Sequence, residues 1–137
     1  MPAMIVDSNV LLDILTEDSQ WFQWAGTALA EAAQHHTLVI NAVIFAEVSV
    51  RFPRIEDVND ALPLEWFERR VIPYEAAFLA AKCFLAYRRR GGERSAVLPD
   101  FFIGAHAAVE GLRLITRDVG RYRTYFPWLD IISPSGS

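Results

Sequence analysis

Cysteine, lysine and long apolar runs are scarce in this sequence. Its 137 residues include one cysteine, Cys83, and one lysine, Lys82. A single cysteine has no partner for a disulfide within the chain, and Cys83 is expected to be a small buried hydrophobe rather than a reactive thiol. No apolar run approaches the roughly 18 residues of a membrane span, and no cationic segment precedes an apolar stretch as in a secretory signal. We therefore expect a globular protein of the reducing cytoplasm.

Metal-binding patterns of histidine and cysteine are also absent. His35 and His36 are adjacent, so they cannot share one face of a helix, and His106 stands alone. Together with a single cysteine, these residues offer no zinc-ligand spacing. The histidines are therefore expected to have structural roles.

The charged residues are unevenly distributed along the chain. The formal net charge is −4, which by itself argues against a nucleic-acid partner. However, every basic side chain except Lys82 is an arginine, and many lie in the segments "YRRRGGER" and "TRDVGRYR". Arginine suits bidentate contacts with phosphate, although a solvated helix end and a solvated loop explain these segments equally well.

Short apolar runs alternate with helical patterns along the chain. The runs typical of strands are 4–6, 37–40, 70–74, 112–116 and 128–132, and the helical patterns cover 9–15, 19–34, 42–51, 75–90 and 100–111. Strands separated by helices predict a parallel sheet covered on both faces. The expected fold is an α/β sandwich, in which ligands bind beyond the carboxyl ends of the strands.

Four acidic residues stand where this fold would place a site. Asp7 follows the first strand, Asp118 follows the fourth, and Asp100 opens a helix. Glu47 lies on the apolar face of its helix and needs a partner there. Each acid also has a simpler explanation: a turn for the two that follow strands, an N-cap for Asp100, and an ion pair with Arg51 for Glu47.

Taken together, the four carboxylates favour a bound cation. At 4 Å and an effective dielectric constant of 20, each pair of negative charges would repel by about 4 kcal/mol. A divalent cation turns that repulsion into attraction, and hard Mg²⁺ or Mn²⁺ prefers carboxylate oxygens. We therefore expect a magnesium-type site at this edge of the sheet.

These motifs resemble those of a known family. The segments that carry the resemblance are "MIVDSNVLL", "NAVIFAEV", "LPDFFIGAHA" and "GLRLITRDVGRY". In order, context and chain length they look like the four acidic motifs of PIN-domain ribonucleases, in particular the VapC toxins of bacterial toxin–antitoxin pairs. The resemblance implies one PIN-like nuclease domain over residues 1–132 and a frayed tail over residues 133–137. It also implies a three-layer α/β/α sandwich with a central, mostly parallel sheet of four to five strands.

The resemblance further implies an activity, a cofactor and partners. A protein of this kind would be an endoribonuclease that cuts single-stranded or loop RNA with one or two Mg²⁺ or Mn²⁺ ions, forms a homodimer and is inhibited by a VapB-type antitoxin. The catalytic metal ligands would be the four acids, namely Asp7, Glu47, Asp100 and Asp118. The polar residues beside the first and last acids would hydrogen-bond to them, namely Ser8, Asn9 and Thr116.

Two surfaces are predicted from the residues themselves. Arginines near the expected strand edge are candidates for holding RNA phosphates, namely Arg88, Arg89, Arg90, Arg94 and Arg117. The helix over 75–90 is apolar almost all round, which predicts burial on every side and, in so small a domain, a homodimer. The aromatic residues Trp21, Phe22 and Trp24 crowd one helical turn, and we interpret them as ordinary core in preference to an antitoxin site.

One alternative remains open from the sequence alone. A catalytically silent PIN-like protein could bind RNA or a partner and keep its acids for structure. The nearby Asp13 is interpreted differently from Asp7: it lies among apolar residues of the first helix, and we predict that it forms a salt bridge or lies on the helix face.

Overall fold

The computed structural model describes residues 1–92 and 98–134. Its strands are β1 (Ala3–Val6), β2 (Thr37–Ile40), β3 (Glu68–Arg69), β4 (Arg113–Ile115) and β5 (Ile131–Ile132). Its helices are α1 (Ser8–Leu15), α2 (Phe22–His35), α3 (Ala42–Ser49), α4 (Ile55–Ala61), α5 (Tyr74–Arg89), α6 (Leu98–Glu110) and α7 (Gly120–Tyr125).

The strands form one parallel sheet in the order β3-β2-β1-β4-β5. The central strand β1 pairs with both β2 and β4, so that Met4 lies opposite Leu38 and Ile5 opposite Leu114. In a parallel sheet all carboxyl ends lie at the same edge. The residues that follow β1, β2 and β4 are therefore brought together although they are far apart in the sequence.

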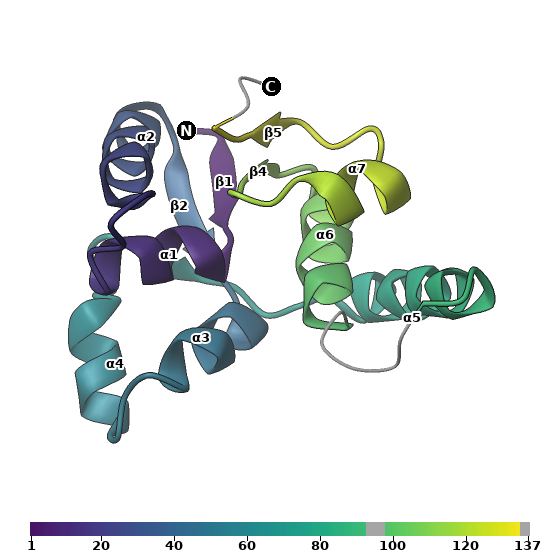
Figure 1. The fold of residues 1–137 in the computed structure, drawn as a ribbon, viewed down its shortest axis with the longest axis horizontal. Helices are drawn as coiled ribbons and strands as arrows, with labels where there is room; N and C mark the ends of the chain where they lie inside the picture. Colours follow the sequence, from purple (N-terminus) through teal and green to yellow (C-terminus); the bar gives the residue numbers. More distant parts are fainter. Residues whose placement is uncertain (93–97, 135–137) are drawn as a thin grey trace.

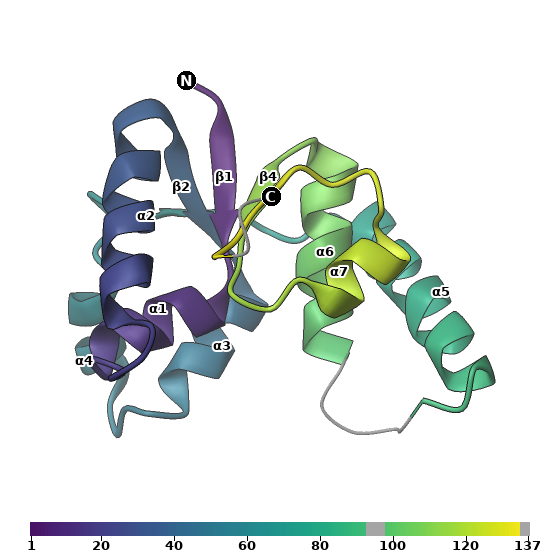
Figure 2. The ribbon, with the colours of Figure 1, turned by 45° about the horizontal axis from the view of Figure 1, so that its top comes forward.

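Helices cover both faces of the sheet. Figures 1 and 2 show α1 and α2 on one side of the sheet and α6 on the other, with α5 packed against α6. The fully buried residues include Ile5 in β1 and Leu114 in β4. The three-layer α/β/α prediction is confirmed, and in the described part of the chain no helix is long and apolar enough to cross a membrane.

Close packing requires a glycine at one point in α6. A Cβ atom at Gly104 would clash with the ring of Phe126, which is fully buried. The absence of a side chain at Gly104 therefore allows a close approach, here to the segment after α7. At the end of the same helix Gly111 has a positive φ of 66°, a conformation that glycine adopts without strain.

The third strand lies elsewhere than its sequence pattern predicted. It was expected over 70–74, but β3 is Glu68–Arg69, and the pairing ends where Arg70 N donates to Ile40 O at 3.0 Å. The apolar residue Val71 is exposed, and Pro73 has no N–H to continue a ladder. An edge strand is paired on one side only, so its apolar pattern is a weak guide.

The prediction that the helix over 75–90 is buried on every side was wrong. Only its inner face, with Ala76, Ala80 and Cys83, is buried, whereas Phe78 on the outer face is 65% exposed. Burial raises the pKa of the Cys83 thiol, in keeping with an unreactive role.

The aromatic cluster of the early helix is core only in part, since Trp24 packs against the buried residues. Phe22 is 39% exposed, and Trp21 and Trp24 are only half-buried. Several large rings within one turn cannot all face inward, since a helix presents only one stripe to the sheet.

Candidate functional site

Asp7 is the buried centre of the site. It directly follows β1, its backbone N–H donates to Ile115 O at 3.0 Å, and its side chain is 3% exposed. Although Asp7 occupies the N-cap position of α1, its carboxylate makes no capping hydrogen bond. Instead, Oδ2 accepts hydrogen bonds from Thr116 Oγ1 at 2.8 Å, Tyr122 OH at 2.9 Å and Asn9 Nδ2 at 3.4 Å.

Burying the Asp7 carboxylate costs free energy, and the hydrogen-bond donors reduce this cost only in part. Loss of water raises the pKa of Asp7, and the hydrogen bonds from Thr116, Tyr122 and Ser8 lower it by less. No basic side chain in the described part of the chain forms an ion pair with Asp7, and a buried carboxylate without such a pair is costly in free energy. Such an arrangement is typical of a side chain positioned for chemistry.

Glu47 lies beside Asp7 on the neighbouring helix. It is on α3, which begins after Asn41 caps it by accepting from Ile44 N at 3.0 Å. Its Oε1 accepts a hydrogen bond from Ser8 Oγ at 2.8 Å, and Ser8 also lies 3.5 Å from Asp7 Oδ1. Burial raises the pKa of Glu47, and the negative charge of Asp7 raises it further. Within the described residues the contact of this carboxylate is therefore Ser8 and not Arg51.

Asp100 faces the same cluster from the opposite side of the sheet. It is the third residue of α6, so the helix begins before it and it is not the N-cap that its sequence position suggested. Arg121 Nη1 donates to Asp100 Oδ2 at 2.7 Å. Burial raises the pKa of Asp100 to about 6, and the negative charges of Asp7 and, to a smaller extent, Glu47 contribute to the increase. The contact with Arg121 lowers this pKa but does not cancel the increase.

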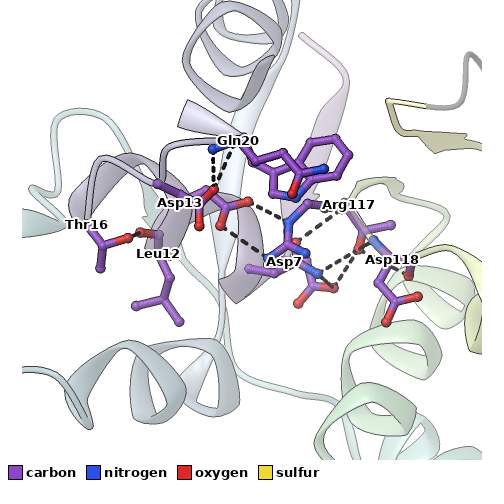
Figure 3. A network of polar contacts seen from close by, with 11 residues as sticks. Asp7, Leu12, Asp13, Thr16, Gln20, Arg117 and Asp118 are labelled. Carbon is purple, nitrogen blue, oxygen red and sulfur yellow. Dashed lines mark hydrogen bonds and ion pairs between the residues drawn. The ribbon is translucent and has the colours of Figure 1, made fainter. Parts of the chain in front are cut away.

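Asp118 is placed differently from the other three acids. Its side chain is exposed, and its backbone N–H donates to Thr116 Oγ1 at 3.2 Å. Figure 3 shows Asp7 and Asp118 linked through these contacts, with Arg117 beside them and directed at Asp13. The structure therefore brings Asp7, Glu47 and Asp100 within electrostatic reach of one another and leaves Asp118 at the rim.

Sequence reasoning missed two contacts to the acids, and both come from α7. Tyr122 is buried and donates a hydrogen bond to Asp7. Burial, followed by the negative charge of Asp7, raises the pKa of Tyr122 well above its usual value. Arg121, the preceding residue, binds Asp100. From the sequence, "GRYR" was noted only as part of an arginine-containing segment. An arginine and a tyrosine next to each other, just after the last acid, were the available signal.

A buried histidine links the two helices that carry Glu47 and Asp100. The Asn41 side-chain amide lies 3.0 Å from His106 Nδ1, and His106 Nε2 lies 3.1 Å from Glu110 Oε1. Burial lowers the pKa of His106, which favours the neutral ring that these contacts require. This places His106 in a structural role, as predicted.

The predicted phosphate-binding arginines are found in different environments. Arg117 is paired with buried Asp13 through Nε at 2.7 Å and Nη2 at 3.2 Å, so Asp13 forms the expected salt bridge. Arg88, Arg89 and Arg90 lie at the carboxyl end of α5 and its cap, and Arg90 stacks on the ring of Tyr125. Arg94 lies outside the described residues.

The cluster suits a hard divalent cation in donor type and charge. Its side chains offer carboxylate and hydroxyl oxygens, which Mg²⁺ and Mn²⁺ prefer. Over residues 1–92 and 98–134, however, no three His, Cys, Asp or Glu side chains are grouped as they stand to hold a metal ion. In this arrangement Glu47 accepts a hydrogen bond from Ser8, and Asp100 is paired with Arg121.

Comparisons with known proteins agree with this fold. A family model described as the PIN domain matches residues 4–127, whereas a comparison with curated proteins found no match. The fold is similar to that of VapBC2 from Rickettsia felis, solved with promoter DNA, with 16% identity, a TM-score of 0.72 and coverage of 96% of this chain and 98% of that chain. It is also similar to FitAcB from Neisseria gonorrhoeae, with 18% identity, a TM-score of 0.70 and coverage of 96% and 98%. A toxin–antitoxin complex from Klebsiella pneumoniae has 22% identity, a TM-score of 0.70 and the same coverage of 96% and 98%.

At these low identities the similarity to solved structures shows the fold alone, whereas the family model shows the family. The model spans all four acidic motifs and the strands that position them. The chain therefore belongs to the PIN domain family.

Proposed function

We propose that this protein is a metal-dependent endoribonuclease of the VapC type, acting in the cytoplasm on single-stranded or loop RNA. PIN domains are generally nucleases, and PIN nucleases generally use divalent metal ions. The observation that carries the proposal is the buried carboxylate of Asp7, which is held by Thr116 and Tyr122 and faces Glu47 and Asp100.

The acidic residues and the polar residues around them would have different roles. Asp7, Glu47 and Asp100, joined by Asp118 from the rim, would hold one or two Mg²⁺ or Mn²⁺ ions. Bound there, a divalent ion would lower the pKa of a water molecule and neutralise charge on the phosphoryl oxygens. Thr116, Tyr122 and Asn9 fix the orientation of the Asp7 carboxylate, and Ser8 bridges Asp7 and Glu47.

The products follow from the attacking group. Hydrolysis by water in line with the leaving ribose oxygen would leave a 5′-phosphate and a 3′-hydroxyl and would not require the 2′-OH. The arginines at the end of α5 would hold flanking phosphates, namely Arg88, Arg89 and Arg90. Arg94 and Arg117 remain predicted phosphate ligands, and in Arg117 the pairing with Asp13 competes with that role.

Cleavage is expected to depend strictly on the cation. Purified protein incubated with end-labelled RNA and Mn²⁺ should produce fragments with 5′-phosphates, and EDTA should stop the reaction. A panel of structured and unstructured RNAs covers the unknown sequence preference. Cleavage that survives EDTA would contradict the metal requirement. Absence of cleavage across the whole panel would favour the catalytically silent alternative.

An antitoxin partner is proposed for the same protein. Structures with this fold were solved as VapBC and FitAB complexes, and we infer a VapB-type inhibitor here. The product of a reading frame immediately upstream should bind the protein and lower the rate of RNA cleavage. If that product left the rate unchanged at a stoichiometric excess, the pairing would be wrong.

The outer face of α5 supports a homodimer. Tyr74, Phe78, Ala81 and Leu85 are all exposed there and follow the i, i+4, i+7, i+11 spacing of a helix–helix seam. Figures 1 and 2 show α5 at the edge of the molecule, with α6 on one side and no other described element on the side away from α6. Pairing with a second copy would remove these side chains from water.

Phe78→Lys is expected to convert the dimer to a monomer, because a charge at the centre of the seam would have to be buried. Light scattering at micromolar concentration should give twice 15.5 kDa for the wild type and 15.5 kDa for the variant. Glu75→Gln, at an exposed position of the same helix away from the seam, changes the net charge by the same amount and should stay dimeric. A monomeric wild type would refute the dimer.

A further inference from the structure

Among the described residues, Arg121 is the basic side chain that contacts the acidic cluster directly. Its Nη1 lies 2.7 Å from Asp100 Oδ2, and its guanidinium also lies over the ring of Tyr87 on α5. The next residue, Tyr122, donates to Asp7. One turn of α7 therefore brings the guanidinium of Arg121 and the hydroxyl of Tyr122 to two of the proposed metal ligands.

The pairing of Arg121 with Asp100 differs from that of Arg117 with Asp13. Asp13 is nearly inaccessible and uses both of its oxygens on Arg117. The side chains of Asp100 and Arg121 are 27% and 31% exposed, and one oxygen of Asp100 makes the contact. Arg121 is partly accessible to solvent and also contacts the ring of Tyr87, so it can leave the carboxylate without leaving the site.

Electrostatics favours such an exchange once a cation arrives. Asp7, Glu47 and Asp100 together carry a charge of −3 when ionised, and Arg121 offsets one unit of it in the structure described. A divalent cation among the same carboxylates would repel the guanidinium and compete with it for Asp100. A guanidinium released beside the ring of Tyr87 presents its fork of N–H donors to any phosphate that enters.

We propose that Arg121 is an exchangeable counter-ion: it binds Asp100 in the free protein, yields that carboxylate to the divalent cation, and then binds a phosphate of the RNA strand. This inference rests on the proposed nuclease function and names the group that couples metal binding to RNA binding. The neighbouring stack of Arg90 on Tyr125 continues the basic surface from this point toward the end of α5.

The first measurement is metal affinity without RNA. Arg121→Gln removes the competing charge and keeps a polar side chain, so by calorimetry it should bind Mn²⁺ about three- to tenfold more tightly than the wild type. Arg121→Lys keeps the charge and should remain close to the wild type. If Arg121 only held α7 to α6, its loss would leave Mn²⁺ affinity unchanged or weaker. An unchanged or weaker Mn²⁺ affinity of Arg121→Gln would refute the exchange. Absence of Mn²⁺ binding by the folded wild type would also refute it.

The second measurement is RNA affinity in EDTA, where no metal is bound and no metal-dependent cleavage occurs. Asp100→Asn frees Arg121, whereas Glu47→Gln removes an equal charge from the cluster and leaves the Arg121 pair in place. Fluorescence anisotropy with a labelled RNA oligonucleotide should show a larger gain in affinity for Asp100→Asn. The extra gain of Asp100→Asn should vanish when Arg121→Gln is added to it. The slope of log affinity against log salt concentration should then also decrease in magnitude by about 0.7, the contribution of one phosphate contact. Equal gains for the two single variants, or no RNA binding by any of them, would refute the phosphate contact.

These measurements are separable from the proposed activity. A protein that binds Mn²⁺ and RNA in the expected pattern but cleaves no RNA would refute the nuclease proposal and leave the counter-ion in place. Conversely, strong cleavage by a protein whose Arg121→Gln variant shows no gain in Mn²⁺ affinity would refute the counter-ion alone. Thermal unfolding of each variant, followed by circular dichroism, shows whether it is folded.

Discussion

Replacing Asp7 with asparagine is expected to abolish RNA cleavage and to leave the fold intact. Asparagine has nearly the same shape, and its amide oxygen can still accept the hydrogen bonds that Thr116 and Tyr122 donate. The buried charge is lost, however, and burial raises the pKa of this carboxyl, so its removal costs little stability.

The expected loss of activity is large because the charge lies at the centre of the cluster. Cation binding and charge neutralisation contribute several kcal/mol to such reactions, so the rate should fall about a thousandfold or more. Initial rates with labelled RNA and Mn²⁺ measure this, and the unfolding midpoint verifies the fold. Asp60→Asn, an exposed aspartate of α4, removes the same charge elsewhere and should cleave at the wild-type rate. An active, folded Asp7→Asn variant would remove the basis of the proposed site.

Replacing Arg117 with methionine is expected to give the largest loss of stability. The Asp13 side chain is 6% exposed and is paired with Arg117 through both oxygens, so the variant leaves a buried carboxylate unpaired. Breaking such pairs costs about 3–5 kcal/mol, and we expect the lower end of that range because Arg117 itself is 32% exposed. Urea unfolding monitored by tryptophan fluorescence measures the difference.

Two further variants isolate the cause of that loss. Arg54→Met breaks an exposed pair with Glu56 and should cost less than about 1 kcal/mol. Adding Asp13→Asn to Arg117→Met removes the unpaired charge and should restore part of the stability. A loss for Arg117→Met no greater than that for Arg54→Met would show that the pair is not structural. Arg117 would then be free for the predicted phosphate contact.

Much of the site could be anticipated from residue type and position. Asp7, Glu47 and Asp100 do face one another, and Ser8, Asn9 and Thr116 do hydrogen-bond to the acids they adjoin in sequence or across the sheet. This works because a parallel sheet gathers its carboxyl ends at one edge, whatever the chain between them contains. Metal binding and catalysis by these acids remain predictions.

Other features escaped prediction for physical reasons that are specific to each. The pattern of apolar residues in 70–74 did not show where an edge strand would pair, because an edge is held from one side only. The uniform apolarity of α5 did not show which of its faces meets α6 and which stays exposed. Arg117 could not be assigned to Asp13, since that choice depends on how α1 lies against the end of β4.

The sequence by itself determined the class of fold, the order of its elements and the acidic character of one sheet edge. Those properties depend on local periodicity and on residue type, both of which can be read along the chain. Only the tertiary structure decided that Tyr122 holds Asp7, that Arg121 occupies Asp100 and that Asp118 remains exposed at the rim. These are choices among partners distant in sequence, and packing selects them by geometry that no local pattern encodes.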